Sequence, residues 1–144
     1  MVKEKLLVSA CFVSDGYKYD GTNNINDEIL KLQDKYEFVL VCPEVYGGLN
    51  TPRKPSEGLN GKVFMNDGTD VTEEFKKGAL KSLEKALNNG VKRALLKAKS
   101  PSCGYGKIYD GSFSHTVVDG NGVFVQLLLE NNILVYTEED ISSL

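Results

Sequence analysis

Four short apolar runs, separated by helical and loop segments, constrain the fold of this chain more than any other feature. The runs cover residues 5–10, 37–41, 91–98 and 133–136, and their aliphatic and β-branched content predicts buried strands. Amphipathic helices are predicted over residues 26–36, 72–89 and 123–132. Strands that alternate with helices in this way indicate an α/β fold, a three-layer sandwich with a mostly parallel, Rossmann-like sheet.

Capping and turn residues suggest where the elements begin and end. Asn26 and Thr72 are candidate N-caps, and Gly90 can end the longest helix. The apolar stripe predicted for that helix comprises Phe75, Ala79, Leu83, Ala86 and Leu87. Residues 43–61 and the Gly-rich segment from Cys103 to about Gly122 are predicted to be loops, and residues 62–71 a small hairpin that turns at 66–68.

Size and composition restrict the class of protein. A chain of 144 residues is long enough for one hydrophobic core, and no linker or repeat interrupts it, so residues 1–144 are predicted to form a single α/β domain. A net charge of −3 provides no basic surface for nucleic acid or anionic lipid, and no apolar run is long enough to cross a membrane. We expect a cytoplasmic protein with a small-molecule partner. Nothing in the sequence indicates an oligomeric state.

The positions of the three cysteines are the most informative chemical pattern. Cys11 and Cys42 each directly follow a predicted strand, and Cys103 follows residues 91–98 after a short Ser/Pro segment. The carboxyl ends of parallel strands share one edge of the sheet, so we expect the three thiols to converge there. In a reducing compartment they are more often free thiols or metal ligands than disulfides. Buried cysteines are also common as small apolar residues, and without a CxxC pair the pattern alone does not identify a metal.

Other reactive side chains lie in the same predicted loops. Glu44 follows Cys42 closely enough to serve as an acid or base, and the hydroxyls of Ser100 and Ser102 can donate hydrogen bonds near Cys103. Arg53 can hold an anionic or carbonyl group, or form a structural ion pair. Each of these residues also has an ordinary structural interpretation as a solvated loop or turn residue. The pocket candidates Tyr17, Tyr19, Asp20 and Tyr109 to Ser112 and the single histidine, His115, favour a structural interpretation.

Several motifs extend along nearly the whole chain: Ser9-Ala10-Cys11, Tyr19-Asp20-Gly21, Val41-Cys42-Pro43-Glu44-Val45, Gly47-Gly48-Leu49, Thr51-Pro52-Arg53, Asp67-Gly68, Asp70-Val71-Thr72, Ser100-Pro101-Ser102-Cys103-Gly104 and Ile108-Tyr109-Asp110-Gly111. Together they resemble one bacterial family, long described as a domain of unknown function, that contains the iron–sulfur-dependent thiouracil desulfidases. The succession SAC, CPE and SPSCG, in that order, is the most specific part of the resemblance.

This resemblance implies a 4Fe-4S cluster ligated by Cys11, Cys42 and Cys103, with one iron left open for the sulfur of a thiolated, thiouracil-like nucleobase. Glu44 would activate the attacking water. Ser100, with Ser102 as the alternative, would donate a hydrogen bond or a proton near the leaving sulfur. The sulfur would leave as hydrosulfide without net redox change.

The chain also departs from the pattern of this family. Tyr17 stands where many relatives have a further cysteine, His115 where glycine is common, and Asn50 where proline is usual. Two other interpretations remain open beside a desulfidase. One is a non-catalytic sulfur carrier or redox-sensing iron–sulfur module, and the other is an ordinary small-molecule-binding domain with three incidental cysteines.

Overall fold

Four parallel strands form the central sheet of the computed structural model, which describes residues 3–14, 18–59 and 61–144. The strands are β1 (Glu4–Ser9), β2 (Tyr36–Val41), β5 (Arg93–Leu96) and β8 (Leu134–Thr137), and their spatial order is β2-β1-β5-β8. All three neighbouring pairs run parallel. The predicted parallel α/β sheet is therefore confirmed, and the four apolar runs of the sequence are its strands.

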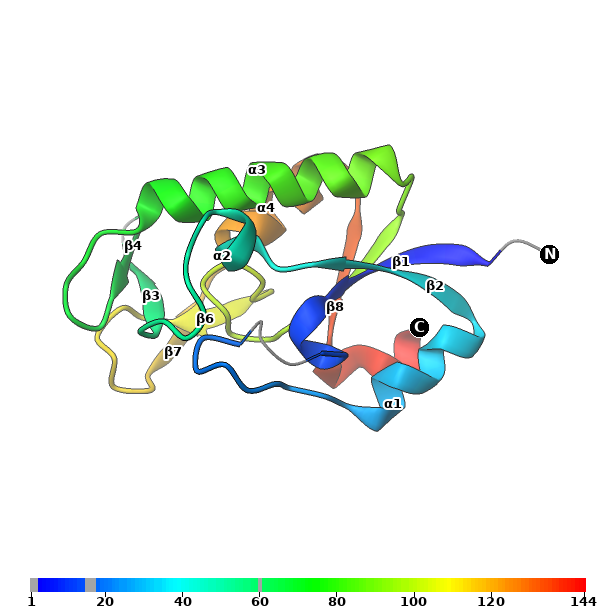
Figure 1. Cartoon of the computed structure of the whole chain (residues 1–144), viewed down its shortest axis with the longest axis horizontal. Coiled ribbons are helices and arrows are strands. Elements are labelled where there is room, and N and C mark those ends of the chain that lie inside the picture. The colour runs from blue at the N-terminus through cyan, green and yellow to red at the C-terminus, as the bar shows by residue number, and fades with distance from the viewer. Residues whose placement is uncertain (1–2, 15–17, 60) are drawn as a thin grey trace.

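Helices cover both faces of the sheet, as Figure 1 shows. The long helix α3 (Thr72–Asn88) and α4 (Val123–Glu130) lie on one face. The other face is covered by α1 (Asp27–Leu30) with the 3-10 turn η2 (Lys31–Asp34), and by η3 (Glu138–Ser143) near the C-terminus. These elements make the three layers that the sequence predicted. Among the described residues, no helix combines the length and the apolar character needed to cross a membrane.

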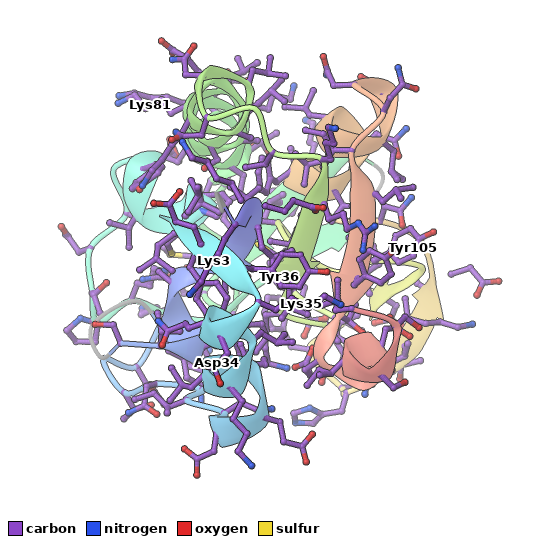
Figure 2. All side chains as sticks on the ribbon, turned by 90° about the vertical axis from the view of Figure 1, so that its right-hand side faces the viewer. Lys3, Asp34, Lys35, Tyr36, Lys81 and Tyr105 are labelled. Atoms are coloured by element: carbon purple, nitrogen blue, oxygen red, sulfur yellow. The ribbon has the colours of Figure 1, made fainter. Side chains whose placement is uncertain are left out.

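Alternating side chains of the central strand β1 fill the two cores. Leu7 packs with α3 and α4, whereas Leu6 and Val8 pack on the opposite side with Ile29 of α1. All of these side chains are fully buried, and each contributes about 1.5–3 kcal/mol through removal of its apolar surface from water. Figure 2 shows side chains packed on both sides of the strands, with charged groups such as Lys81 directed outward. A strand buried on both faces explains the continuous apolar run at residues 6–8.

The structure corrects two expectations about α3. Val71, not Thr72, occupies the N-cap position, because the Thr72 hydroxyl accepts a hydrogen bond from Val63 N at 2.9 Å and donates one to Asp70 Oδ1 at 2.6 Å. Leu87 is 52% exposed, so it lies outside the buried stripe predicted for the helix. Asn26, in contrast, caps α1 as predicted, since its side chain accepts hydrogen bonds from two backbone N–H groups of the first turn.

Two antiparallel hairpins stand beside the sheet, at the left of Figure 1, where the sequence predicted mostly loop. The first pairs β3 (Ser56–Leu59) with β4 (Lys62–Met65), and the second pairs β6 (Lys107–Tyr109) with β7 (Val117–Asp119). The small hairpin predicted within residues 62–71 is confirmed, because Phe64 bridges Asp70 and Val71 N donates to Val63 O at 2.9 Å across the predicted turn. The pairing of β4 with β3 was not predicted. Glu57 links the two hairpins, because its Oε1 accepts hydrogen bonds from Gly111 N and Phe113 N.

Candidate functional site

Each of the three cysteines lies just beyond the carboxyl end of a sheet strand. Cys11 is in the 3-10 turn η1 (Ala10–Phe12) after β1, and Cys42 is the N-cap residue of the short helix α2 (Pro43–Tyr46) after β2. Cys103 lies in the loop that follows β5, and its side chain is buried. The parallel sheet therefore brings residues from three distant parts of the sequence to one edge, here called the three-cysteine site.

The thiols lie near enough to one another that Cys42 and Cys11 affect the pKa of Cys103, and Cys11 affects the pKa of Cys42. Burial raises the pKa of the Cys103 thiol far above its ordinary value, and the thiols of Cys42 and Cys11 raise it further. Burial likewise raises the pKa of Cys42 to about 11 and is the main cause of the raised pKa of Cys11. Such thiols are protonated at neutral pH. A bound metal centre would replace those protons, because a coordinated thiol is deprotonated.

The donor set of three cysteines suits an iron–sulfur cluster. Across residues 3–14, 18–59 and 61–144, no three Cys, His, Asp or Glu side chains close around one ion position. A 4Fe-4S cluster takes each thiolate on a different iron, so its ligands need not converge on one point. The chain contains three cysteines in all, which would ligate three irons and leave the fourth without a cysteine ligand. Thiolates are also the characteristic ligands of such clusters.

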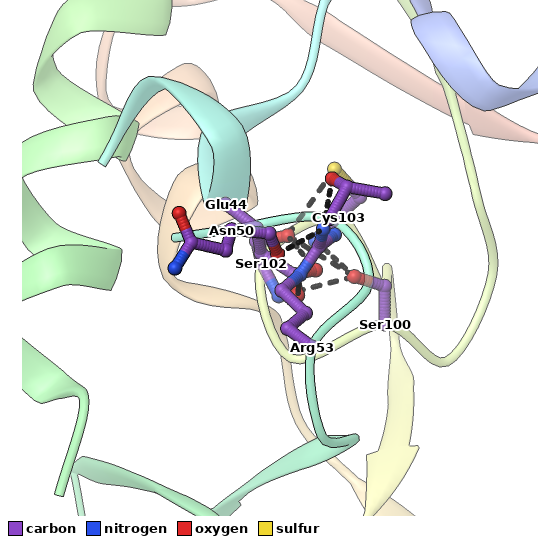
Figure 3. A network of polar contacts seen from close by, with 7 residues as sticks. Glu44, Asn50, Arg53, Ser100, Ser102 and Cys103 are labelled. Carbon is purple, nitrogen blue, oxygen red and sulfur yellow. Dashed lines mark hydrogen bonds and ion pairs between the residues drawn. The ribbon is translucent and has the colours of Figure 1, made fainter. Parts of the chain in front are cut away.

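A chain of polar side chains adjoins Cys103 (Figure 3). The Ser102 hydroxyl oxygen lies 3.5 Å from Cys103 Sγ and 3.5 Å from Glu44 Oε2. Ser100 Oγ lies 3.1 Å from Ser102 Oγ and accepts hydrogen bonds from the backbone N–H groups of Ser102 and Cys103. Because those two N–H groups use the lone pairs of Ser100 Oγ, its own proton is best donated to Ser102 Oγ. The proton of Ser102 is then directed to Glu44 or Cys103.

Arg53 holds the other oxygen of the Glu44 carboxylate. Its Nε donates to Glu44 Oε1 at 3.1 Å, and its Nη1 donates to Thr51 Oγ1 at 3.0 Å. The Arg53 side chain is only 4% exposed and that of Glu44 17%, so water screens this ion pair weakly. Of the two interpretations open for Arg53, the structure shows the ion pair.

Close backbone packing fixes α2, which carries Glu44, against α3. A Cβ atom added at Gly78 would lie 1.7 Å from Pro43 O, and one added at Gly47 would lie 2.0 Å from Glu74 O. Only glycine permits this approach of the two helices. Lys85 of α3 adds a second tie, because its Nζ donates to Leu40 O at 2.6 Å, near the end of β2.

The first turn of α4 holds the loop that contains Ser102 and Cys103. Val123 N donates to Pro101 O at 3.0 Å, and Phe124 N donates to Ser102 O at 2.9 Å. The otherwise unpaired N–H groups of the helix N-terminus are satisfied in this way, and the loop is fixed in place.

The other candidates from the sequence lie apart from this network or outside the described residues. Tyr17 belongs to the undescribed residues. Tyr19 takes part through its backbone only, since its carbonyl accepts from Arg53 N at 2.5 Å. Asp20 and Asp110 form local turns with Thr22 and Ser112. His115 contacts the Tyr109 ring edge-on, in the second hairpin.

Two polar neighbours of the cysteines were missed by the sequence analysis. Asn24 Nδ2 donates to Cys11 Sγ at 3.4 Å, and a hydrogen bond from the Ser9 hydroxyl lowers the pKa of Cys103. Asn24 lies among other polar loop residues, and no local pattern distinguishes it. Ser9 immediately precedes a predicted strand end, which is the one signal that could have placed it near the site.

Comparison with known proteins shows the family of this chain. The family model described as 2-thiouracil desulfurase matches residues 6–140. The uncharacterized protein YbbK of Bacillus subtilis (strain 168) is 36% identical in an alignment 149 residues long, which covers 96% of this chain and 99% of YbbK. The solved structure of the [4Fe-4S]-dependent thiouracil desulfidase TudS (DUF523Vcz) is 40% identical, covers 99% of this chain and 95% of its own, and superposes with a TM-score of 0.91. This chain belongs to the 2-thiouracil desulfurase family.

Proposed function

We propose that this chain is a 4Fe-4S-dependent desulfidase, which replaces the sulfur of a thiouracil-like base with oxygen and releases hydrosulfide. The observation that carries the proposal is the contact chain from Glu44 through Ser102 to Cys103, in which a carboxylate and a hydroxyl lie beside one of the three cysteines. Family membership and the solved relative support the same reaction.

Cys11, Cys42 and Cys103 would hold the cluster. When bound, the cluster supplies an iron without a cysteine ligand, a Lewis acid to which the sulfur of a thiocarbonyl can bind. Cys103 is 5% exposed and belongs to an apolar core cluster, so the protein would keep water away from its sulfur.

In the overall reaction, water oxygen forms a bond to the thiocarbonyl carbon while the bond from carbon to sulfur breaks. The sulfur leaves with the electron pair, one proton of the water ends on sulfur and the other is released, so no oxidant or reductant is needed. We propose that Glu44 accepts the proton of the attacking water on Oε2, the oxygen that faces Ser102. Arg53 would keep Oε1 occupied and thereby fix the orientation of the carboxylate.

Ser102 and Ser100 would act as a relay in this scheme. Ser102 Oγ lies 3.5 Å from both Glu44 Oε2 and Cys103 Sγ, so its hydroxyl could donate a hydrogen bond to the leaving sulfur of the substrate. Ser100 would orient the Ser102 hydroxyl by donating a hydrogen bond to it. The Ser100 hydroxyl proton is free to do so because the backbone N–H groups of Ser102 and Cys103 already donate to Ser100 Oγ. A sulfur carrier or redox-sensing module does not need a carboxylate in this position, which favours the desulfidase.

A turnover assay of the Glu44→Gln variant tests the proposal. Protein reconstituted without oxygen is mixed with 2-thiouracil, and uracil and hydrosulfide are measured together with iron content. Glutamine preserves the size of the side chain and can accept from Arg53, but it cannot take a proton from water. We expect equal amounts of both products from the unsubstituted chain, and a rate at least 10²-fold lower from the variant at unchanged iron content. Full activity of the glutamine variant would exclude the assigned role of Glu44, and an inactive, iron-loaded unsubstituted chain would favour the carrier.

A further inference from the structure

One loop residue, Asn24, is bonded twice to the ligand candidate Cys11. Its backbone N–H donates to Cys11 O at 2.8 Å, and its side-chain Nδ2 donates to Cys11 Sγ at 3.4 Å. The backbone bond fixes the position of the residue beside Cys11, and the side-chain bond then aims an amide donor at the sulfur. The amide can therefore donate to the sulfur without rearrangement when Cys11 becomes a thiolate.

The two cysteines differ in their surroundings. Cys103 is buried, and the Ser102 hydroxyl lies 3.5 Å from its sulfur. Cys11 is only partly buried, and the Asn24 amide donates to its sulfur.

We propose that Asn24 is a positioning residue for the cluster, which determines how firmly the cluster is retained and at what potential it is reduced. The inference rests on the proposed function, because it requires Cys11 to bind as a thiolate. A hydrogen bond to a charged acceptor is stronger than one to a neutral acceptor, so the amide favours the ligated thiolate over the free thiol. Hydrogen bonds to the sulfurs also stabilise the additional negative charge of a reduced cluster, which raises the reduction potential.

Three variants separate this role from a purely structural one. Asn24→Ala removes the donor, and Asn24→Asp replaces it with a carboxylate oxygen that repels the thiolate. Asn23→Asp is the matched control: it introduces the same charge one residue away, and its carboxylate can still accept from Ile25 N, as Asn23 Oδ1 does at 3.0 Å. The backbone bond from residue 24 to Cys11 is available to all of them.

The readouts are the rate at which a chelator bleaches the visible absorption of anaerobically reconstituted protein, and the reduction potential of the cluster. We expect both Asn24 variants to lose the cluster roughly 10-fold to 100-fold faster than the unsubstituted chain. Their potentials should be lower, with Asn24→Asp the lowest, while Asn23→Asp behaves as the unsubstituted chain.

Equal loss rates and potentials in all variants would overturn the inference. So would a lower melting temperature of cluster-free Asn24→Ala combined with an unchanged potential of the loaded protein, because Asn24 would then only hold the loop. Failure of the unsubstituted chain to take up iron would overturn the proposed function together with the inference. An unsubstituted chain that takes up iron but does not turn over a thio-base would contradict the proposed function and leave the inference about Asn24 standing.

Discussion

Gly78→Ala should weaken the proposed desulfidase activity although residue 78 is remote from the substrate, because it lies under the helix that carries Glu44. The added Cβ would lie 1.7 Å from Pro43 O, 2.7 Å from Pro43 C and 2.8 Å from Gly47 N. All three are backbone atoms, so no side-chain rotation can relieve the contact. The whole of α2 must move away from α3, and Pro43 stands between Cys42 and Glu44.

The size of the effect follows from these distances. Normal contact requires about 3.2 Å, so Pro43 O must retreat by roughly 1.5 Å, and a displacement of about 1 Å in a reacting group can lower a rate by roughly 10²-fold. Overpacking of this kind costs about 1–3 kcal/mol, and the better helix propensity of alanine offsets up to about 1 kcal/mol of it. An offset of about 1 kcal/mol leaves a net loss of up to about 2 kcal/mol, which corresponds to a melting temperature lower by up to roughly 8 °C.

The assay compares turnover, iron content and melting temperature of Gly78→Ala with those of Gly58→Ala. A Cβ at Gly58 would meet its nearest atom, Lys62 O, at an ordinary 3.7 Å, so this second change controls for a glycine-to-alanine substitution in itself. We expect a large loss of turnover for Gly78→Ala and little for Gly58→Ala. Unchanged turnover and melting temperature in Gly78→Ala would refute the argument that backbone packing of α2 on α3 positions Glu44.

Three further changes test other parts of the structure. Ser102→Ala should lower turnover by roughly 10²-fold to 10⁴-fold at unchanged iron content, and equal turnover would remove Ser102 from the relay. Arg53→Ala should lower turnover by roughly 10²-fold, because Glu44 Oε1 loses its donor. Arg53→Lys should retain only part of the turnover, since the single ammonium group of lysine cannot also reach Thr51. Full activity of Arg53→Ala would contradict the orienting role of Arg53. Hydrogen bonds from Thr72 hold the pKa of the Asp70 carboxyl below its ordinary 3.8, so their stabilisation is present above that pH and is lost as the pH falls through the lower, folded-state pKa. The melting temperature of Asp70→Asn should therefore fall less on acidification than that of the unsubstituted chain, and parallel curves would contradict this.

The sheet could be predicted from the sequence because its two central strands, β1 and β5, carry continuous buried runs. Residues such as Leu6, Leu7 and Val8 form an uninterrupted apolar run that no exposed segment would carry. The two hairpins had no such signal. Their strands are short, and the residues of β7 are all exposed, so their stability depends on partners such as Glu57 from another part of the chain.

Errors at α3 have a different physical cause. Thr72 is a favourable N-cap residue by type, but Val63 and Asp70 compete for its hydroxyl in the folded chain. Leu87 has helical spacing with the core residues, yet it is 52% exposed at the last turn of the helix, whereas its neighbour Ala86 is fully buried. Tertiary context decided both positions.

The site was predictable where it depends on topology and not where it depends on loop conformation. Parallel strands bring their carboxyl ends to one edge, so the approach of Cys11 and Cys42 followed from their places after two strands. The contact of Arg53 with Glu44 and that of Asn24 with Cys11 arise between loop residues, and no spacing rule describes them. For the same reason, the hydrogen bond between the hydroxyls of Ser100 and Ser102 could not be predicted from the sequence.

The content of iron and acid-labile sulfide tests the central claim most directly. The chain is reconstituted without oxygen, and both elements are measured per chain together with the visible spectrum, in parallel with the Cys11→Ser, Cys42→Ser and Cys103→Ser variants. The account predicts about four of each in the unsubstituted chain and loss of the cluster in every variant. An unsubstituted chain that takes up no iron, or serine variants that keep the full cluster, would contradict it.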